Sequence, residues 1–247
     1  MSANHFGPYT EDNIHPGFSV DCVILTFHKG KLKVLLRELG LRNYWALLGG
    51  FMFHEENADQ AAHRILESYT GLKNIFLKQF HLFSDPARTI MDQNMDFVRQ
   101  NVTSGKKVEW FLRRFISMGY FALVKYDSVA LPNDTKDVLR WYDAKTLPPL
   151  YSDHKNIVET ALANIRAMLP VIPVGYELLP EKFTMSELRK IYEIILEKTF
   201  DRRNFQRKVL SEGNVIQLKE KKSTRTYNPP SLFSFDLSKK DLTGIIH

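Results

Sequence analysis

The sequence has one cysteine and no long apolar run. Cys22 alone, among 247 residues, cannot form an internal disulfide or a zinc site built from several thiolates, and it fits a reducing compartment. No apolar stretch approaches the roughly 18 residues that a membrane-spanning helix needs. Residues 1–15 lack a basic segment followed by an apolar one, so we expect no secretion signal. These absences favour a cytoplasmic protein that makes no use of a membrane.

The excess of positive charge is also small. Lys and Arg number 34 against 28 Asp and Glu, a net charge of +6. Residues 177–247 hold 14 of the cations and 10 of the anions, which leaves 20 and 18 for the rest of the chain. Pro170 and Pro173 stop a helix and stiffen a connector between these two parts. We therefore expect two domains, residues 1–172 and residues 173–247, of which the second is the more basic.

The first domain mixes strands and helices. Apolar, β-branched runs predict strands, and a capping box at Asn57 and Gln60 with a stop at Gly71 predicts a helix. A second helix begins at Ser152 or Asp153 and spans 154–168. The remaining elements expected are strands at 19–27, 32–36, 76–83, 115–124 and 139–142. Because the strands and helices do not alternate strictly, the pattern predicts an α+β sandwich.

The segment around the first helix resembles the Nudix box. That motif reads Gly-x5-Glu-x7-Arg-Glu-apolar-x-Glu-Glu-x-Gly-apolar, and the residues that match it here are Gly50, Glu56, Arg64, Leu66, Gly71 and Leu72. Trp45–Phe51 resembles the lead-in of the family. Phe83–Arg88 and Gly119–Val124 resemble segments of the Nudix-related transcriptional regulators. The resemblance implies a Nudix-like mixed-sheet α/β/α sandwich.

The three helical glutamates of the box are replaced by Ile65, Ser68 and Tyr69. In Nudix hydrolases those carboxylates share one helix face and hold the divalent cations that activate water. An isoleucine, a hydroxyl and an aromatic ring cannot do so. We therefore expect no metal site, no catalytic residue, no cofactor and no enzyme activity. A plainer interpretation, that Ile65 and Tyr69 join the apolar stripe of the helix, is compatible with this loss.

The second domain carries two helices with a short turn between them. Thr184 and Glu187 form a capping box, and apolar residues then recur at helical spacing from Leu188 to Leu196. Asp201 caps a second helix that Gly213 ends, so we expect a helix-turn-helix. Strands at 215–218 and 232–235 with a basic tip between them add a wing. The whole resembles the winged helix-turn-helix domain of the Nudix-related regulators.

A winged helix of this kind places polar side chains in the major groove and cations on phosphates. A solvated basic helix face is the alternative interpretation of the same residues. The residues that we expect to contact double-stranded operator DNA are Thr184, Ser186, Arg202, Arg203, Asn204, Arg207, Lys208, Lys221, Lys222 and Arg225.

Together the two resemblances predict a ligand-responsive transcriptional regulator, in the repressor mode, that binds its operator as a homodimer. The family's effectors include ADP-ribose-type nucleotides and sugars. Loss of the metal route to phosphate favours a sugar such as arabinose, with a nucleotide of NAD metabolism as the alternative. A residual Nudix hydrolase and a protein-interaction module without a DNA role also remain open. By family position, the candidate ligand-binding residues are Arg37, Glu38, Trp45, Tyr69, His81, Asp85 and Arg88.

Overall fold

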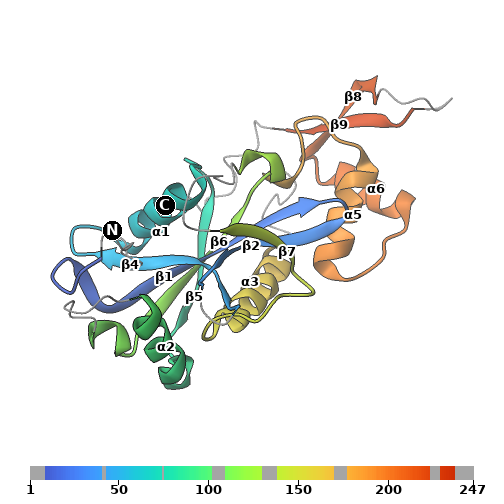
Figure 1. Cartoon of the computed structure of the whole chain (residues 1–247). Coiled ribbons are helices and arrows are strands. Elements are labelled where there is room, and N and C mark those ends of the chain that lie inside the picture. Colours follow the sequence, from blue (N-terminus) through green and yellow to red (C-terminus); the bar gives the residue numbers. More distant parts are fainter. Residues whose placement is uncertain are drawn as a thin grey trace.

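A mixed sheet lies between two helices in the first part of the chain (Figure 1). The computed structural model describes residues 9–40, 43–73, 75–101, 109–129, 138–169, 177–222 and 229–236. Its strands in this part are β1 (Ile14–His28), β2 (Lys31–Glu38), β3 (Trp45–Ala46), β4 (Leu48–Phe53), β5 (Leu77–Phe83), β6 (Ile116–Leu123) and β7 (Leu139–Asp143). The helices are α1 (Ala58–Thr70), α2 (Met91–Asn101) and α3 (His154–Met168).

The long strand β1 organises the sheet. It runs parallel to β6, from Phe18 opposite Ile116 to Leu25 opposite Leu123. On its other edge it pairs antiparallel with β2 near its end and with β4 near its start. β2 continues to β3 and β7, and β5 pairs with β6. This topology confirms the mixed sheet that the Nudix resemblance implied.

Alternate residues of β1 enter two separate cores. Val23 and Leu25 pack with α3 on one face, whereas Cys22 and Ile24 pack with α1 on the other. This two-sided burial explains the continuous apolar run in β1, because a strand covered on both faces needs no polar side. The Asn57–Gln60 capping box and the left-handed Gly71 bound α1 as predicted.

Three of the elements listed above, β3, β4 and α2, were not predicted. α2 has four apolar residues, and those at helical spacing, Met91, Met95 and Val98, make only a short stripe. β4 contains Gly49 and Gly50, which are poor strand formers. These elements are held by strand pairing and packing with residues distant in the sequence, which a local sequence pattern cannot show.

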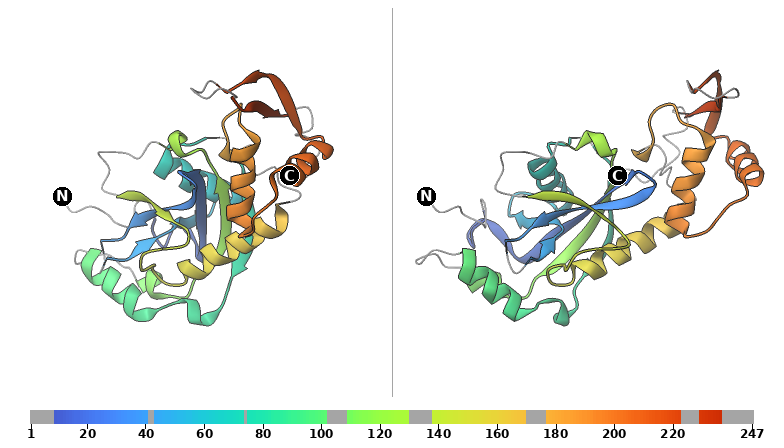
Figure 2. Two further views of the ribbon diagram at one scale, coloured as in Figure 1. Left: turned by 90° about the vertical axis from the view of Figure 1, so that its right-hand side faces the viewer. Right: turned by 45° about the vertical axis from the view of Figure 1, so that its right-hand side comes forward.

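The last part of the chain is a winged helix (Figure 2). α5 (Met185–Leu196) begins at the Thr184 capping box, and α6 (Arg202–Ser211) begins at Asp201, whose carboxylate accepts a hydrogen bond from the Asn204 N–H. β8 (Val215–Lys221) and β9 (Ser231–Phe235) form the wing hairpin. The predicted helix-turn-helix and wing are confirmed. The expected connector between the domains, 170–176, lies outside the described residues.

Candidate effector and nucleic-acid sites

The two glycines of β4 make room for groups on opposite faces of the sheet. A methyl group on Gly49 would clash with the Asp21 carboxylate, and one on Gly50 would clash with the Tyr9 hydroxyl. A larger residue at either position would therefore displace a polar side chain that packs against β4. Asp21 is part of a buried polar network, and the Tyr9 hydroxyl accepts a hydrogen bond from Arg64 of α1.

The surviving charged residues of the Nudix box are joined to each other. The Glu56 carboxylate accepts hydrogen bonds from the Arg64 guanidinium, Nε at 2.9 Å, and from the Phe53 N–H at 2.8 Å. Arg64 also donates to the Phe51 carbonyl and to the Tyr9 hydroxyl. Burial acts to raise the pKa of Glu56, but the hydrogen bonds from Arg64 and Phe53 outweigh it and lower the pKa. This pair therefore fixes the loop before α1, a structural role that needs no metal ion.

The face of α1 that carries the glutamates in the hydrolases is now partly core. Ile65 is buried, and Ser68 Oγ donates to the Ile65 carbonyl at 2.7 Å. Glu67, the acid next to Ser68 on the helix, pairs with Lys73 at 3.0 Å. In the part of the chain that the structure describes, no group of three His, Cys, Asp or Glu side chains is placed to hold a metal ion.

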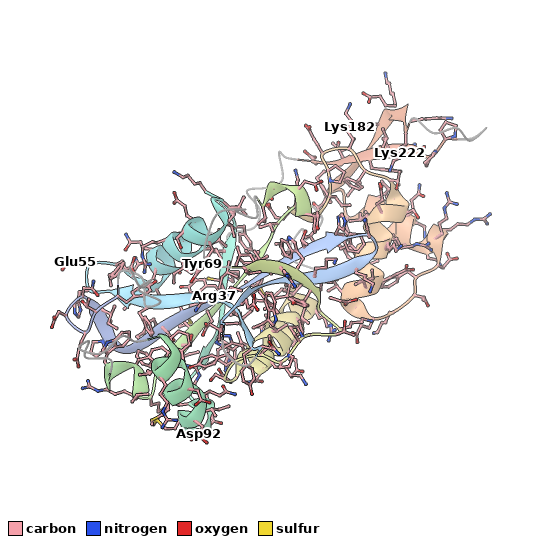
Figure 3. The ribbon with its side chains drawn as sticks, viewed as in Figure 1. Arg37, Glu55, Tyr69, Asp92, Lys182 and Lys222 are labelled. Atoms are coloured by element: carbon pink, nitrogen blue, oxygen red, sulfur yellow. The ribbon has the colours of Figure 1, made fainter. Side chains whose placement is uncertain are left out.

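Arg37 and Tyr69 come together from different elements (Figure 3). The Arg37 guanidinium carbon of β2 lies 5.7 Å from the centre of the Tyr69 ring of α1. Both side chains are partly exposed. A guanidinium beside an aromatic ring can take an anionic group and a flat ring system side by side.

Trp45 and Glu38 lie opposite each other in the β2–β3 pairing. Trp45 is buried against Tyr142, and the Arg140 guanidinium lies 5.7 Å from its ring. Trp45 is therefore a core aromatic in this structure, whereas the neighbouring Glu38 is partly exposed.

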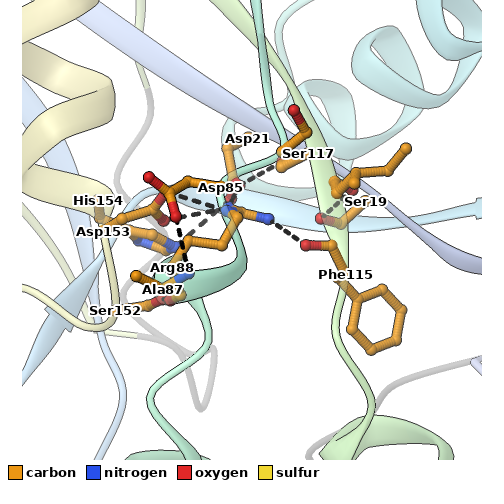
Figure 4. A network of polar contacts seen from close by, with 12 residues as sticks. Ser19, Asp21, Asp85, Ala87, Arg88, Phe115, Ser117, Ser152, Asp153 and His154 are labelled. Atoms are coloured by element: carbon orange, nitrogen blue, oxygen red, sulfur yellow. Dashed lines mark hydrogen bonds and ion pairs between the residues drawn. The ribbon is translucent and has the colours of Figure 1, made fainter.

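Arg88 lies in a buried ionic network (Figure 4). Its Nε and one terminal nitrogen donate to the two Asp153 carboxylate oxygens at 2.9 and 3.1 Å, and the other nitrogen donates to the Phe115 carbonyl. Asp21 Oδ2 is 3.7 Å away, and it accepts from Ser117 Oγ at 2.5 Å. With 7% of its side chain exposed, Arg88 is held by protein groups in this structure.

His154 completes this network and was not singled out in the sequence. Its Nδ1 accepts from the Leu47 N–H at 3.0 Å, and its Nε2 lies 3.7 Å from Asp21 Oδ1. Burial lowers the pKa of His154 more than the nearby carboxylates raise it, so the ring is neutral with its proton on Nε2. The available signal was Asp21 itself, an acid within an otherwise apolar strand.

The other two effector candidates, Asp85 and His81, lie in the segment from β5 to the following helical turn. Asp85 accepts from the Ala87 N–H and so caps the short helical turn Pro86–Arg88 that carries Arg88. His81 is an exposed residue of β5, with its ring 4.7 Å from that of Phe83. Among the seven candidates, Arg37 and Tyr69 are in direct contact.

The outer face of α6 is exposed and cationic. Phe205 and Val209 are buried and hold the helix against α5 and the wing. Arg207 donates to the Asn204 side chain at 3.0 Å, which aligns a guanidinium with an amide on the solvent side. The exposed side chains of this face are Arg202, Arg203, Asn204, Arg207 and Lys208.

The remaining nucleic-acid candidates differ in how their side chains are used. Thr184 is buried, and its Oγ1 accepts from the Glu187 N–H, so it caps α5. Lys222 donates to Glu187 at 2.6 Å and so ties the wing to the start of α5. Ser186 and Lys221 are exposed. Arg225 lies outside the described residues.

Comparison with known proteins places this geometry in context. Residues 175–235 match the NrtR DNA-binding winged helix domain. The fold of the whole chain is similar to that of solved NrtR structures. Within the described residues, no helix is long and apolar enough to cross a membrane.

Relatives cover both parts of the chain. The ADPR responsive transcriptional repressor NtrR of Acinetobacter baylyi is 24% identical over 233 residues, which are 92% of this chain and 84% of that protein. The crystal structure of Shewanella oneidensis NrtR has a TM-score of 0.68 at 22% identity, over 92% of this chain and 96% of that one. The same protein bound to a 27mer DNA gives 0.67 at 22% identity, over 89% and 93%. These structures establish a Nudix-like domain followed by a winged helix.

Proposed function

We propose that this chain is an ADP-ribose-responsive transcriptional repressor. Its winged helix would bind operator DNA, and its Nudix-like domain would bind the nucleotide without hydrolysing it. The observation that carries the proposal is the match of residues 175–235 to a DNA-binding domain, within an alignment that covers 92% of the chain and joins it to a repressor named for its response to ADPR. The division into residues 1–172 and 173–247 belongs to this proposal.

The relatives favour the nucleotide over the sugar that the sequence reasoning preferred. The sugar was favoured because positions 65, 68 and 69 lack the carboxylates that bind metal ions, and a diphosphate was expected to need those ions. Metal ions are required to polarise the phosphate and activate water, whereas binding alone can rely on a guanidinium. Arg37 beside the Tyr69 ring offers a cation for phosphate and a flat surface for a base.

The replaced face of α1 supports binding without turnover. Ile65 is buried and Tyr69 faces Arg37, so neither position supplies an oxygen ligand for a cation. Glu56, the acid of the box that remains, is held by Arg64 and Phe53. A residual hydrolase would need a carboxylate cage that these contacts do not provide.

Repression would follow from the spacing of two winged helices. A homodimer on a palindromic site needs its two reading helices about one turn of DNA apart, or a multiple of it. An effector that prefers a conformation with another spacing lowers operator affinity by population shift. The homodimer is part of the proposal and supplies this geometry.

Calorimetry with the full chain tests the effector. We expect ADP-ribose to bind and arabinose not to bind, and we expect Tyr69→Ala to weaken ADP-ribose about tenfold because it removes the ring beside Arg37. His63→Ala, an exposed change on the same helix, is the matched control. Binding of arabinose instead would restore the sugar hypothesis, and metal-dependent release of products from ADP-ribose would restore the hydrolase.

Selection from a random pool of DNA duplexes tests the other half. We expect the chain to enrich a palindromic sequence and ADP-ribose to release it. Binding without sequence preference would instead favour a protein-interaction module.

A further inference from the structure

The two domains share one apolar core. Ile165 and Leu169, at the end of α3, belong to the same buried cluster as Leu188 and Ile191 of α5. Figure 2 shows the end of α3 lying beside the end of α5. The β1–β2 turn also approaches α5, so closely that a methyl group on Gly30 would lie 2.8 Å from Lys190 Nζ. The junction is therefore a packed contact, and α5 is the element through which the winged helix rests on the sensor domain.

One arginine of the sensor domain closes the end of α5. Arg166, in the last turn of α3, donates from Nε to the Ile195 carbonyl at 2.7 Å and from a terminal nitrogen to Glu197 Oε1 at 2.9 Å. The last carbonyls of a helix have no partner within the helix and carry partial negative charge. α5 thus receives its C-terminal cation from the other domain.

The residue that Arg166 holds has an unusual backbone. Glu197 ends α5 in the left-handed conformation, with φ of 54°, and its N–H donates to the Glu193 carbonyl. Glycine or asparagine is the common residue at such a position, since a side chain there is strained. Glu197 instead uses its carboxylate, which also lies 3.9 Å from Lys145 Nζ. An acid at this position is explained by its partner across the junction.

The contact lies just before the DNA-reading helix. Three residues, 198–200, separate Glu197 from Asp201, the N-cap of α6. The direction in which the chain leaves α5 therefore sets where α6 begins. Beside the contact lies a cavity of about 610 Å³, lined by residues of β2, α3 and α5 that include Leu32, Leu162 and Ile194. This space leaves room for the helices to shift if the contact opens.

We infer that Arg166 and Glu197 form a clasp that sets the orientation of α6 on the sensor domain, and that Arg166 is a positioning residue for effector control of DNA binding. The link to DNA and effector rests on the proposed function. The claim that the clasp orients α6 does not rest on the proposed function, so an experiment can refute either one without refuting the other.

The test compares clasp variants with a matched pair on α3. Lys155 and Glu159 form an exposed pair, 3.8 Å apart, that lies within the helix. Lys155→Gln removes one cation from α3, as Arg166→Gln does, without touching the clasp. Arg166→Lys keeps the charge but cannot make both contacts. Glu197→Gly removes the carboxylate while favouring the left-handed backbone, so it keeps the helix end intact.

Spin labels at His63→Cys on α1 and Ser211→Cys on α6 report the orientation in the full chain. Cys22 is buried and its thiol pKa is raised, so it stays unlabelled. We expect one narrow distance distribution for the parent and for Lys155→Gln, and distributions about twice as wide for Arg166→Gln and Glu197→Gly. Arg166→Lys should lie between them, and the double variant should be no wider than either single one. Parent-like widths in both clasp variants would overturn the inference.

Operator release gives the second measurement. On the DNA selected by the parent chain, we expect the ratio of affinities without and with ADP-ribose to fall at least about fivefold in Arg166→Gln, and to stay unchanged in Lys155→Gln. A ratio unchanged in Arg166→Gln would overturn the regulatory role. If the parent binds neither DNA nor ADP-ribose, the proposed function fails, and the distance measurement still decides whether the clasp orients α6.

Discussion

Two arginines of the sensor domain and three of the winged helix are used in opposite ways. Arg64 and Arg88 of the sensor domain are engaged by carboxylates and carbonyls, and Arg88 is almost fully buried. Arg202, Arg203 and Arg207 of the winged helix stand in solvent on one helix face. The same side chain therefore fixes the fold in one domain and stays available in the other. Four sets of variants test this contrast, from the largest expected effect to the smallest.

Arg88→Met should cause the greatest loss of stability. It leaves Asp21 and Asp153 buried without their cation, which costs about 3–5 kcal/mol of the free energy of unfolding. Urea denaturation of the full chain measures this loss. Arg113→Met, which removes an exposed arginine from an ion pair with Glu11, is the control and should change little. A loss in Arg88→Met as small as that of the control would contradict the assigned role of the network.

Glu56→Gln should destabilise the chain by about 1–3 kcal/mol at neutral pH, because it weakens a half-buried charged hydrogen bond. The pKa of Glu56 is lower in the folded state than its ordinary value of 4.5. The stabilisation is therefore present above pH 4.5 and is lost as the pH falls through the folded-state pKa. Unfolding measured across this range should show a weaker pH dependence in Glu56→Gln than in the parent. An identical dependence in both would show that the pair contributes nothing.

Arg207→Ala should leave the free energy of unfolding unchanged and weaken binding to the selected operator by about 1–3 kcal/mol, with a smaller loss on random DNA. Fluorescence anisotropy at fixed salt measures both affinities. Lys155→Ala removes the same charge far from α6 and controls for net charge. Equal losses on both DNAs would reduce Arg207 to a phosphate contact.

Lys222→Ala should have the smallest effect. Its ammonium already pairs with Glu187. A phosphate contact by Lys222 therefore releases fewer counterions, and adds less to DNA affinity, than one by Lys221. We expect the salt dependence of DNA affinity to fall by about one counterion in Lys221→Ala and by less in Lys222→Ala. The reverse order would show that DNA breaks the Lys222–Glu187 pair on binding.

Local signals made much of the fold predictable. The capping boxes at Asn57 and Thr184 and the turn at Gly71 each lie within a few residues of the helix that they bound, and the structure confirms all three. The α6 face was predictable for the same reason, since helical spacing alone separates Phe205 and Val209 from Arg207.

Pairs that are distant in sequence were beyond this reasoning. Arg88 was named as an effector candidate by its family position. Its contact with Asp153, 65 residues away, could not be predicted, because no local pattern joins the two residues. The contact of Arg37 with Tyr69 likewise depends on how α1 crosses the sheet. The preference for a sugar came from a different source, since it equated binding a diphosphate with hydrolysing it.

The pairing of β1 with β6 has a consequence for synthesis of the chain. Phe18 pairs with Ile116, and the Thr26 hydroxyl bonds to the Val124 carbonyl, so partners about a hundred residues apart must meet. During synthesis, the apolar strand β1 leaves the ribosome before β6 and cannot pair with it until β6 has been made. The winged helix, built from neighbours in sequence, needs no such delay. The first domain thus depends on residues that are made about a hundred positions later. We expect its unpaired strand β1 to be the segment of the nascent chain that chaperones bind.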